Sequence, residues 1–182
     1  MSTVDPRHLV FLDESGANLA MGRSHAWVRR GEEYIEPRPM NWGHNLSLLG
    51  AVRVDGWVTL ATKWKGVRTP DFVAWVRERL APRLRRGDIV LLDNLRPHYA
   101  PAVRTLIEAR GAALKFLPPY SPDFNPIEPV WALVKKHIRA LAPRTATDLR
   151  RVARAARHAV SEAHCQSFFH HAGYVTSTDA WG

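Results

Sequence analysis

The stretch LKFLPPYSPDFNPIEPVWALVKKHIR, residues 114–139, decides the fold. It begins as a short apolar strand and ends as a helix that opens on an acid, Glu128. Four prolines stand between the two, and each fixes φ and disfavours helix in the residue before it. The connection is therefore predicted to be a rigid arm that holds Glu128 in place. The four are Pro118, Pro119, Pro122 and Pro126.

Asn125 is expected to cap this helix, with Pro126 in its first turn. Glu128 then lies near the positive end of the helix dipole, where a carboxylate is a candidate metal ligand. An acid that merely favours the helix start is an equally good interpretation. The helix buries an apolar stripe at helical spacing, formed by Val130, Trp131, Val134 and Ile138.

Two further stretches each end an apolar run with an aspartate. Residues 8–15 read HLVFLDES and residues 88–94 read DIVLLDN, which gives Asp13 and Asp93. Such runs are typical of strands buried on both faces. Aspartates at the carboxyl edge of a sheet lie where open α/β folds keep their sites. Together with Glu128, they form an oxygen ligand set that suits Mg²⁺.

The sequences LLDNLRPH and LPPYSPDFNPIEPVWALVKK resemble the catalytic domain of DDE transposases of the mariner superfamily, in particular its bacterial insertion-sequence branch. The resemblance extends from about residue 8 to Tyr174. It identifies Asp13, Asp93 and Glu128 as the acidic triad, and the 34 residues between Asp93 and Glu128 match the family spacing. The first motif, FLDESG, would be weak by itself.

This resemblance implies that the triad binds two Mg²⁺ or Mn²⁺ ions for cleavage at transposon ends and strand transfer into target DNA. It also implies a homodimer in the active complex. The family carries helix-turn-helix modules before the first Asp, but only 12 residues precede Asp13. Residues 1–182 are thus expected to be a single catalytic domain. It is either a fragment, a degenerate copy, or the second product of a split reading frame, in which case a separate N-terminal polypeptide would recognise the DNA ends. A metal-dependent nuclease without strand transfer and a non-catalytic DNA-binding remnant remain alternatives.

The pattern of elements predicts an α/β fold. Strands are expected at residues 8–13, 45–54, 57–63, 88–93 and 114–117, with Asp55-Gly56 as a hairpin turn. Residues 26–32 are a further candidate for a strand and turn. Helices are expected from Thr69, from Pro101 to Gly111, around Glu128, and from Thr147 through Ala163. Three antiparallel strands followed by two parallel ones, flanked by helices, are also what the family's ribonuclease H-like fold has.

The charge of the chain favours a polyanionic partner. Lys and Arg number 26 against 17 Asp and Glu, a formal net charge of +9. A soluble, Arg-rich protein without a specific partner is the alternative. Arg150 to Arg157 form a basic face with an even chance of touching DNA. The candidate DNA contacts are Lys63, Lys65, Arg68, His98, Lys135, Lys136 and Arg139. For His98 the alternatives are a contact to one of the candidate metal ligands and a loop histidine without a role in the site.

Several other residues were weighed for the site. Glu14 and Asp123 are rival carboxylates, and Asn94 either orients Asp93 or substrate, or caps a turn. The histidines near Cys165 are poorly spaced for zinc. The single cysteine fits a reducing compartment, and neither a signal peptide nor a membrane-spanning run is evident. We therefore expect a cytoplasmic protein, associated with the nucleoid when bound to DNA.

Overall fold

The structure, a computed structural model, describes residues 4–23, 25, 27–37, 43, 45–119 and 121–174. A mixed five-stranded sheet in the order β3-β2-β1-β4-β5 forms its centre. Its first three strands pair antiparallel, and β4 and β5 join parallel to β1 and to each other, as the sequence predicts. The strands are β1 (Leu9–Ala17), β2 (Leu46–Arg53), β3 (Gly56–Trp64), β4 (Ile89–Leu92) and β5 (Ala113–Phe116).

The predicted hairpin joins β2 and β3, but its turn lies one residue earlier than expected. Arg53 pairs with Gly56, so that residues 54 and 55 form the turn. Gly56 begins β3 with φ at +124°, a backbone conformation that side chains with a Cβ rarely adopt. The Asp-Gly signal thus places the hairpin correctly because the glycine is needed directly after the turn.

Two helical crossovers connect the parallel strands. The helix predicted at Thr69 is α1 (Thr69–Trp75), but Arg68 is its N-cap residue, and the Arg68 N–H donates to Asp71 Oδ2 at 3.0 Å. A π-helical turn (Val76–Leu80) and a 3-10 turn (Ala81–Arg83) extend α1 through Pro82. The second crossover, α2 (Pro101–Glu108), begins where the sequence predicts.

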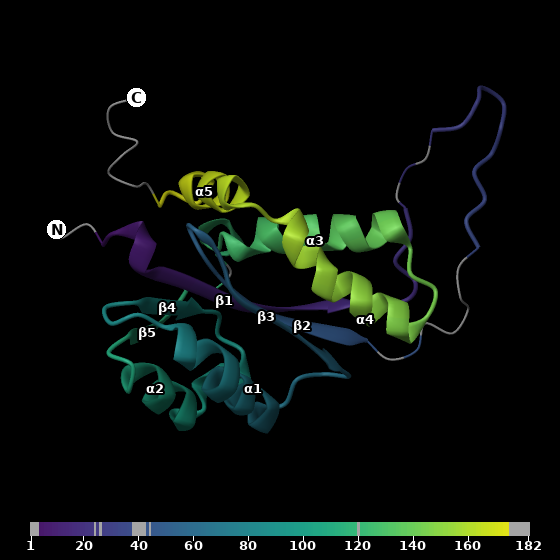
Figure 1. Cartoon of the computed structure of the whole chain (residues 1–182). Helices are drawn as coiled ribbons and strands as arrows, with labels where there is room; N and C mark the ends of the chain where they lie inside the picture. The colour runs from purple at the N-terminus through teal and green to yellow at the C-terminus, as the bar shows by residue number, and fades with distance from the viewer. Residues whose placement is uncertain are drawn as a thin grey trace, which may run out of the picture.

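Helices cover both faces of the sheet (Figure 1). On one side lie α1 and α2, and on the other lie α3 (Ile127–Leu141), α4 (Ala146–Ala155) and α5 (Glu162–His171). The sheet separates two apolar clusters. Because side chains alternate along β1, Val10 and Leu12 pack into the first cluster, with α1 and α2, whereas Leu9 and Phe11 pack into the second cluster, with α3, α4 and α5. None of the described helices is long and apolar enough to cross a membrane.

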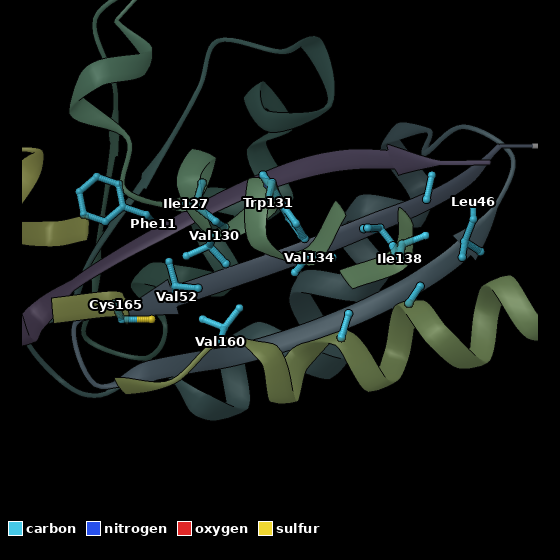
Figure 2. Packing of buried hydrophobic residues seen from close by; sticks show 14 of the residues in the cluster. Phe11, Leu46, Val52, Ile127, Val130, Trp131, Val134, Ile138, Val160 and Cys165 are labelled. Atoms are coloured by element: carbon cyan, nitrogen blue, oxygen red, sulfur yellow. The ribbon is translucent and has the colours of Figure 1, made fainter. Parts of the chain in front are cut away.

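Helix α3 forms the middle of the second cluster. The predicted stripe is buried, and Figure 2 shows it extending along the sheet from Val130, near Val52 of β2, to Ile138, toward Leu46. The helix ends at Ala142, which adopts the left-handed conformation with φ at +42° just before Pro143. Because α3 packs so closely on the sheet, the position of Glu128 in its first turn is fixed.

A buried ion pair fixes the start of β4. The Arg53 guanidinium at the end of β2 contacts the Asp88 carboxylate, and both side chains are almost fully buried. Asp88 also accepts a hydrogen bond from the Arg85 N–H at 2.7 Å. This pairing ties the strand that leads to Asp93 to the antiparallel half of the sheet.

Three expectations about the elements are wrong. Thr145, not Thr147, caps α4, since its side chain accepts from the Asp148 N–H. The single helix expected through Ala163 is interrupted by a 3-10 turn, and Ser161 caps a separate helix, α5, which leaves Ala163 exposed. Residues 27–32 contain no strand; the remaining residue of that candidate, 26, lies outside the described residues.

Candidate active site

The three predicted carboxylates, Asp13, Asp93 and Glu128, line one cavity of about 440 Å³. Each comes from a different element: β1, the loop after β4, and the first turn of α3. The stiff arm between β5 and α3 forms one wall of the cavity. Other lining residues are Asn94, Leu95, Leu117, Pro118, Pro119, Ser121, Pro122 and Asn125.

Strand register explains why two of the acids meet. Strand β1 does not end at Asp13, as predicted, but continues to Ala17 with Asp13 paired to Gly50 of β2. On its other side β1 pairs in parallel with β4, in register from Leu9 to Phe11. Two residues further along this register Asp13 lies beside Asp93, where β4 has already ended. The site therefore opens at the carboxyl end of β4, in the middle of β1.

Asp13 is buried, with 7% of its surface exposed. The Trp131 indole N–H donates a hydrogen bond to Asp13 Oδ2 at 2.9 Å. Burial, together with the nearby negative charges of Glu128 and Asp93, raises the pKa of Asp13 to about 7 in spite of its hydrogen bonds. An electropositive ligand in the cavity would favour the ionised form.

Asp93 is held by His98. The His98 Nδ1 lies 2.6 Å from Asp93 Oδ1, and the Leu95 N–H donates to the same oxygen at 3.1 Å. Partial burial of Asp93 favours its neutral form, but the hydrogen bonds from His98 and Leu95 outweigh it and lower the pKa of Asp93. The two aspartates are therefore in opposite electrostatic environments.

His98 is itself buried, with 1% of its surface exposed, and it packs against the Phe72 ring. Its Nε2 lies 3.9 Å from Glu14 Oε1, within ion-pair distance. Burial disfavours the imidazolium, but the hydrogen bond to Asp93 and the Glu14 carboxylate outweigh it and raise the pKa of His98 to about 9. This burial does not fit a DNA contact for His98 but agrees with the alternative, a contact to a candidate metal ligand, because His98 holds Asp93 from inside the fold.

Glu128 is exposed to the cavity, and its backbone N–H donates to the Asn125 carbonyl at 3.1 Å. The Asn125 side chain does not cap α3, contrary to expectation, because Pro126 is the N-cap residue. Instead Asn125 Oδ1 is buried at the wall of the cavity without a hydrogen-bond partner. A buried carbonyl oxygen without a partner is destabilising unless a ligand contacts it.

The donor set fits a hard divalent cation, because the cavity offers three carboxylates and the Asn125 amide oxygen. As the side chains stand, the described residues contain no group of three or more His, Cys, Asp or Glu arranged to hold a metal. Trp131 and His98 explain part of this, since each binds one carboxylate oxygen. The described histidines near Cys165 likewise form no such metal-binding group. Cys165 itself is buried, and burial raises the pKa of its thiol to about 11.

The other candidates have ordinary partners. The Asn94 side chain hydrogen-bonds neither the Asp93 side chain nor a turn N–H: its Nδ2 donates to the Leu117 carbonyl at 3.0 Å, and its Oδ1 accepts from the Tyr99 hydroxyl at 2.6 Å. It therefore joins the ends of β4 and β5. Asn94 also lines the cavity, and its contact with substrate stays a prediction. Asp123 lies exposed in a 3-10 turn.

Among the predicted DNA contacts, Lys63 and Arg68 both approach Asp71, at 3.3 and 3.7 Å. Lys65 and Lys136 are exposed, whereas Lys135 and Arg139 are half-buried on α3. None of these residues lines the cavity. Their contact with DNA stays a prediction.

Sequence reasoning missed Trp131 as a hydrogen-bond donor and Asn125 as a cavity residue. Trp131 was assigned only to the apolar stripe. It lies three residues after Glu128, on the same helix face, and this spacing was the available signal.

The sheet order, the mixed strand directions and the flanking helices define a ribonuclease H-like fold. A family model described as DDE superfamily endonuclease matches residues 8–150. The chain belongs to this family. A search of curated protein sequences found no significant match.

Solved structures of the Mos1 mariner transposase share the fold. The Mos1 strand transfer complex superposes with a TM-score of 0.68 at 20% identity, over 91% of this chain and 51% of the other. The Mos1 paired end complex with Mn gives 0.64 at 21% identity, over 90% and 52%. The catalytic domain of Mos1 gives 0.62 at 16% identity, over 90% and 76%. The chain thus spans about half the length of the transposase in those complexes.

Proposed function

We propose that this chain is the catalytic domain of an insertion-sequence transposase, which cleaves DNA strands at transposon ends and transfers them into target DNA. The observation that carries the proposal is the convergence of Asp13, Asp93 and Glu128 on one cavity. Membership of an endonuclease family supports the cleavage step. Strand transfer and the insertion-sequence origin go beyond that family assignment.

Asp13, Asp93 and Glu128 would hold two Mg²⁺ or Mn²⁺ ions. When bound, such a pair supplies activation of water or of a DNA 3′-hydroxyl and stabilises the leaving 3′-oxygen. The chain's own contribution is to orient the ligands. Trp131 fixes Asp13, and His98 fixes Asp93, through hydrogen bonds of 2.9 and 2.6 Å.

The direct test replaces Asp93 by Asn, which keeps the size of the side chain and removes its charge. We expect Asp93→Asn to lower the Mg²⁺-dependent nicking of supercoiled DNA by at least about a hundredfold, since even hydrogen-bond partners of metal ligands typically cost 10–100-fold. Asp123→Asn is the matched control, because Asp123 is exposed and outside the cavity. Normal nicking by a folded Asp93→Asn protein would refute the role of Asp93.

A nuclease that cuts without joining is the second candidate, and the family description, which names an endonuclease, favours it. A strand-transfer assay with pre-cut DNA ends separates the two functions, because only a transposase joins such ends to a target plasmid. A third outcome, no Mg²⁺ or Mn²⁺ binding by calorimetry, would identify a non-catalytic remnant.

The partners follow from the same proposal. DNA ends and target DNA are the substrates, and a homodimer forms the active complex in the cytoplasm. The Mos1 structures support the first two points, since they are paired-end and strand transfer complexes, two of them with Mn or Mg.

A further inference from the structure

Strand β3 lies at one edge of the sheet and pairs only with β2. Along this edge runs a hollow of about 640 Å³, which we name the β3 groove. Residues 60–62 of β3 form its floor, Arg79 approaches from the turn after α1, and α4 with its following turn supplies the other wall. The cations of that wall are Arg150, Arg154 and Arg157, with His158 beside them.

The groove gathers positive charge from both layers of the fold. α4 packs on one face of the sheet, and the turn that carries Arg79 packs on the opposite face (Figure 1). Arg150 and Arg154 in α4 and Arg157 in the 3-10 turn that follows are spaced four and three residues apart, so they line one face of this helical stretch. A second hollow of about 410 Å³ shares Arg150 and Arg154 and extends the basic surface to Trp64.

These arginines lack acidic partners. Within the described part of the chain, Arg79, Arg150 and Arg154 form no ion pair, whereas the neighbouring Arg151 pairs with Asp148 at 3.1 Å. Arg150 Nε is buried and has no hydrogen-bond partner. A cluster of like charges with an unused buried donor is destabilising unless an anion joins it, and guanidinium groups match phosphate oxygens in geometry.

We propose that the β3 groove binds the phosphate backbone of double-stranded DNA, as a contact separate from the catalytic cavity. The two sites share no lining residue. Leu60 pairs with Gly50, which pairs with Asp13, so the groove and the cavity share one row of the sheet. Two strand spacings make that row roughly 10 Å long, which is the backbone separation between Leu60 and Asp13. The proposal rests on the DNA substrate of the proposed function but not on its chemistry.

Charged residues also protect edge strands from pairing with other chains, and this is the competing explanation. It requires only that the edge be charged and solvated. It does not predict that DNA affinity depends on this edge more than on the opposite one, β5. The two explanations therefore differ in a measurable way.

The test measures binding of a fluorescein-labelled 30-base-pair duplex of arbitrary sequence by anisotropy, with EDTA present and in the Asp93→Asn background. The groove variant is Arg150→Glu/Arg154→Glu. The matched control is Arg110→Glu/Lys115→Glu, which makes the same charge change at exposed positions beside and on β5. Arg150→Gln/Arg154→Gln is the milder groove variant, and circular dichroism checks that each protein is folded.

We expect the groove variant to bind at least tenfold more weakly than the control at 50 mM salt. Its plot of log affinity against log salt should lose about two units of slope, one for each phosphate contact. The glutamine variant should lose the same slope. Equal weakening by groove and control variants, or unchanged binding by the folded groove variants, would overturn the proposal. Failure of the proposed function would instead appear as a wild-type protein that binds DNA through the groove but does not nick DNA when Mg²⁺ is added.

Discussion

At the residue scale, Asp13 is a carboxylate held where its charge is destabilising. It is buried between β1 and α3, and burial raises its pKa to about 7. The unfolded chain releases this proton near pH 4, whereas the folded protein keeps it up to about pH 7. Between these values the unfolded state therefore binds fewer protons, and stability falls as pH rises. The proposed role as a metal ligand accounts for a carboxyl group at this unfavourable position, because a metal ligand must be ionised.

Asp13→Asn should consequently stabilise the protein in EDTA. Measured by urea unfolding, the gain should be small at pH 4 and reach at most about 4 kcal/mol at pH 8, the equivalent of about three pKa units. The Trp131 N–H can still donate to the amide oxygen of Asn. Asp123→Asn, at an exposed position, should leave the pH dependence of the wild type unchanged. If the stability of the wild type instead rose between pH 4 and pH 7, the result would contradict a raised pKa for Asp13.

At the element scale, the contact between β2 and α3 is the one that shapes the site. A Cβ on Gly50 would lie 2.6 Å from the Trp131 ring and 2.8 Å from the Trp57 ring. These two rings are 5.7 Å apart, and Trp131 also holds Asp13. The absence of a side chain at Gly50 therefore lets α3 approach the sheet closely enough to reach the buried aspartate.

Gly50→Ala should destabilise the protein by about 1–3 kcal/mol, the usual effect of overpacking a rigid contact. Gly16→Ala is the control, because a Cβ at Gly16 in β1 has no heavy atom within 4 Å. It should be neutral or slightly stabilising, since alanine restricts the unfolded chain more than glycine does. The measurement is the midpoint of urea unfolding for each variant. Equal midpoints for the two variants would show that Trp131 is not packed against Gly50.

The elements also show how far the sequence could lead. Strong local signals placed the sheet, the crossover helices and α3 correctly, because apolar periodicity and prolines act within a few residues. The break between α4 and α5 was missed because the apolar spacing from Leu149 to Val160 continues across it. The signal was present in Ser161 and Glu162, a capping residue followed by an acid.

The candidate site was predictable in its acids and in the approach of His98, but not in the contact that Trp131 makes. Asp13, Asp93 and Glu128 stand out by their positions after apolar runs and a rigid turn. That Trp131 and His98 hold two of these acids depends on how α3 and a 3-10 turn pack against the sheet. The β3 groove needs the order of the strands as well, which no local pattern contains. Contacts between elements distant in sequence are thus what the structure adds.

At the scale of the whole molecule, charge is unevenly distributed. The chain carries a formal net charge of +9, yet three carboxylates, those of Asp13, Asp93 and Glu128, line one cavity. A polyanion would be attracted to the basic surface and repelled by the empty acidic site, and divalent cations remove that repulsion. DNA binding and metal binding should therefore reinforce each other.

Non-specific, salt-sensitive DNA binding is the consequence for the chain as a whole. Two 30-base-pair duplexes of unrelated sequence should bind with dissociation constants within about threefold of each other, because phosphate contacts carry no sequence information. Both affinities should fall steeply, on parallel lines, as salt rises from 50 to 200 mM. Fluorescence anisotropy in Mg²⁺ and in EDTA gives these values, and Mg²⁺ should tighten binding relative to a salt-matched EDTA control. Nanomolar binding to one sequence with weak binding to the other would contradict this prediction, because it would mean that the chain reads bases. Base recognition would need an element outside the basic surface.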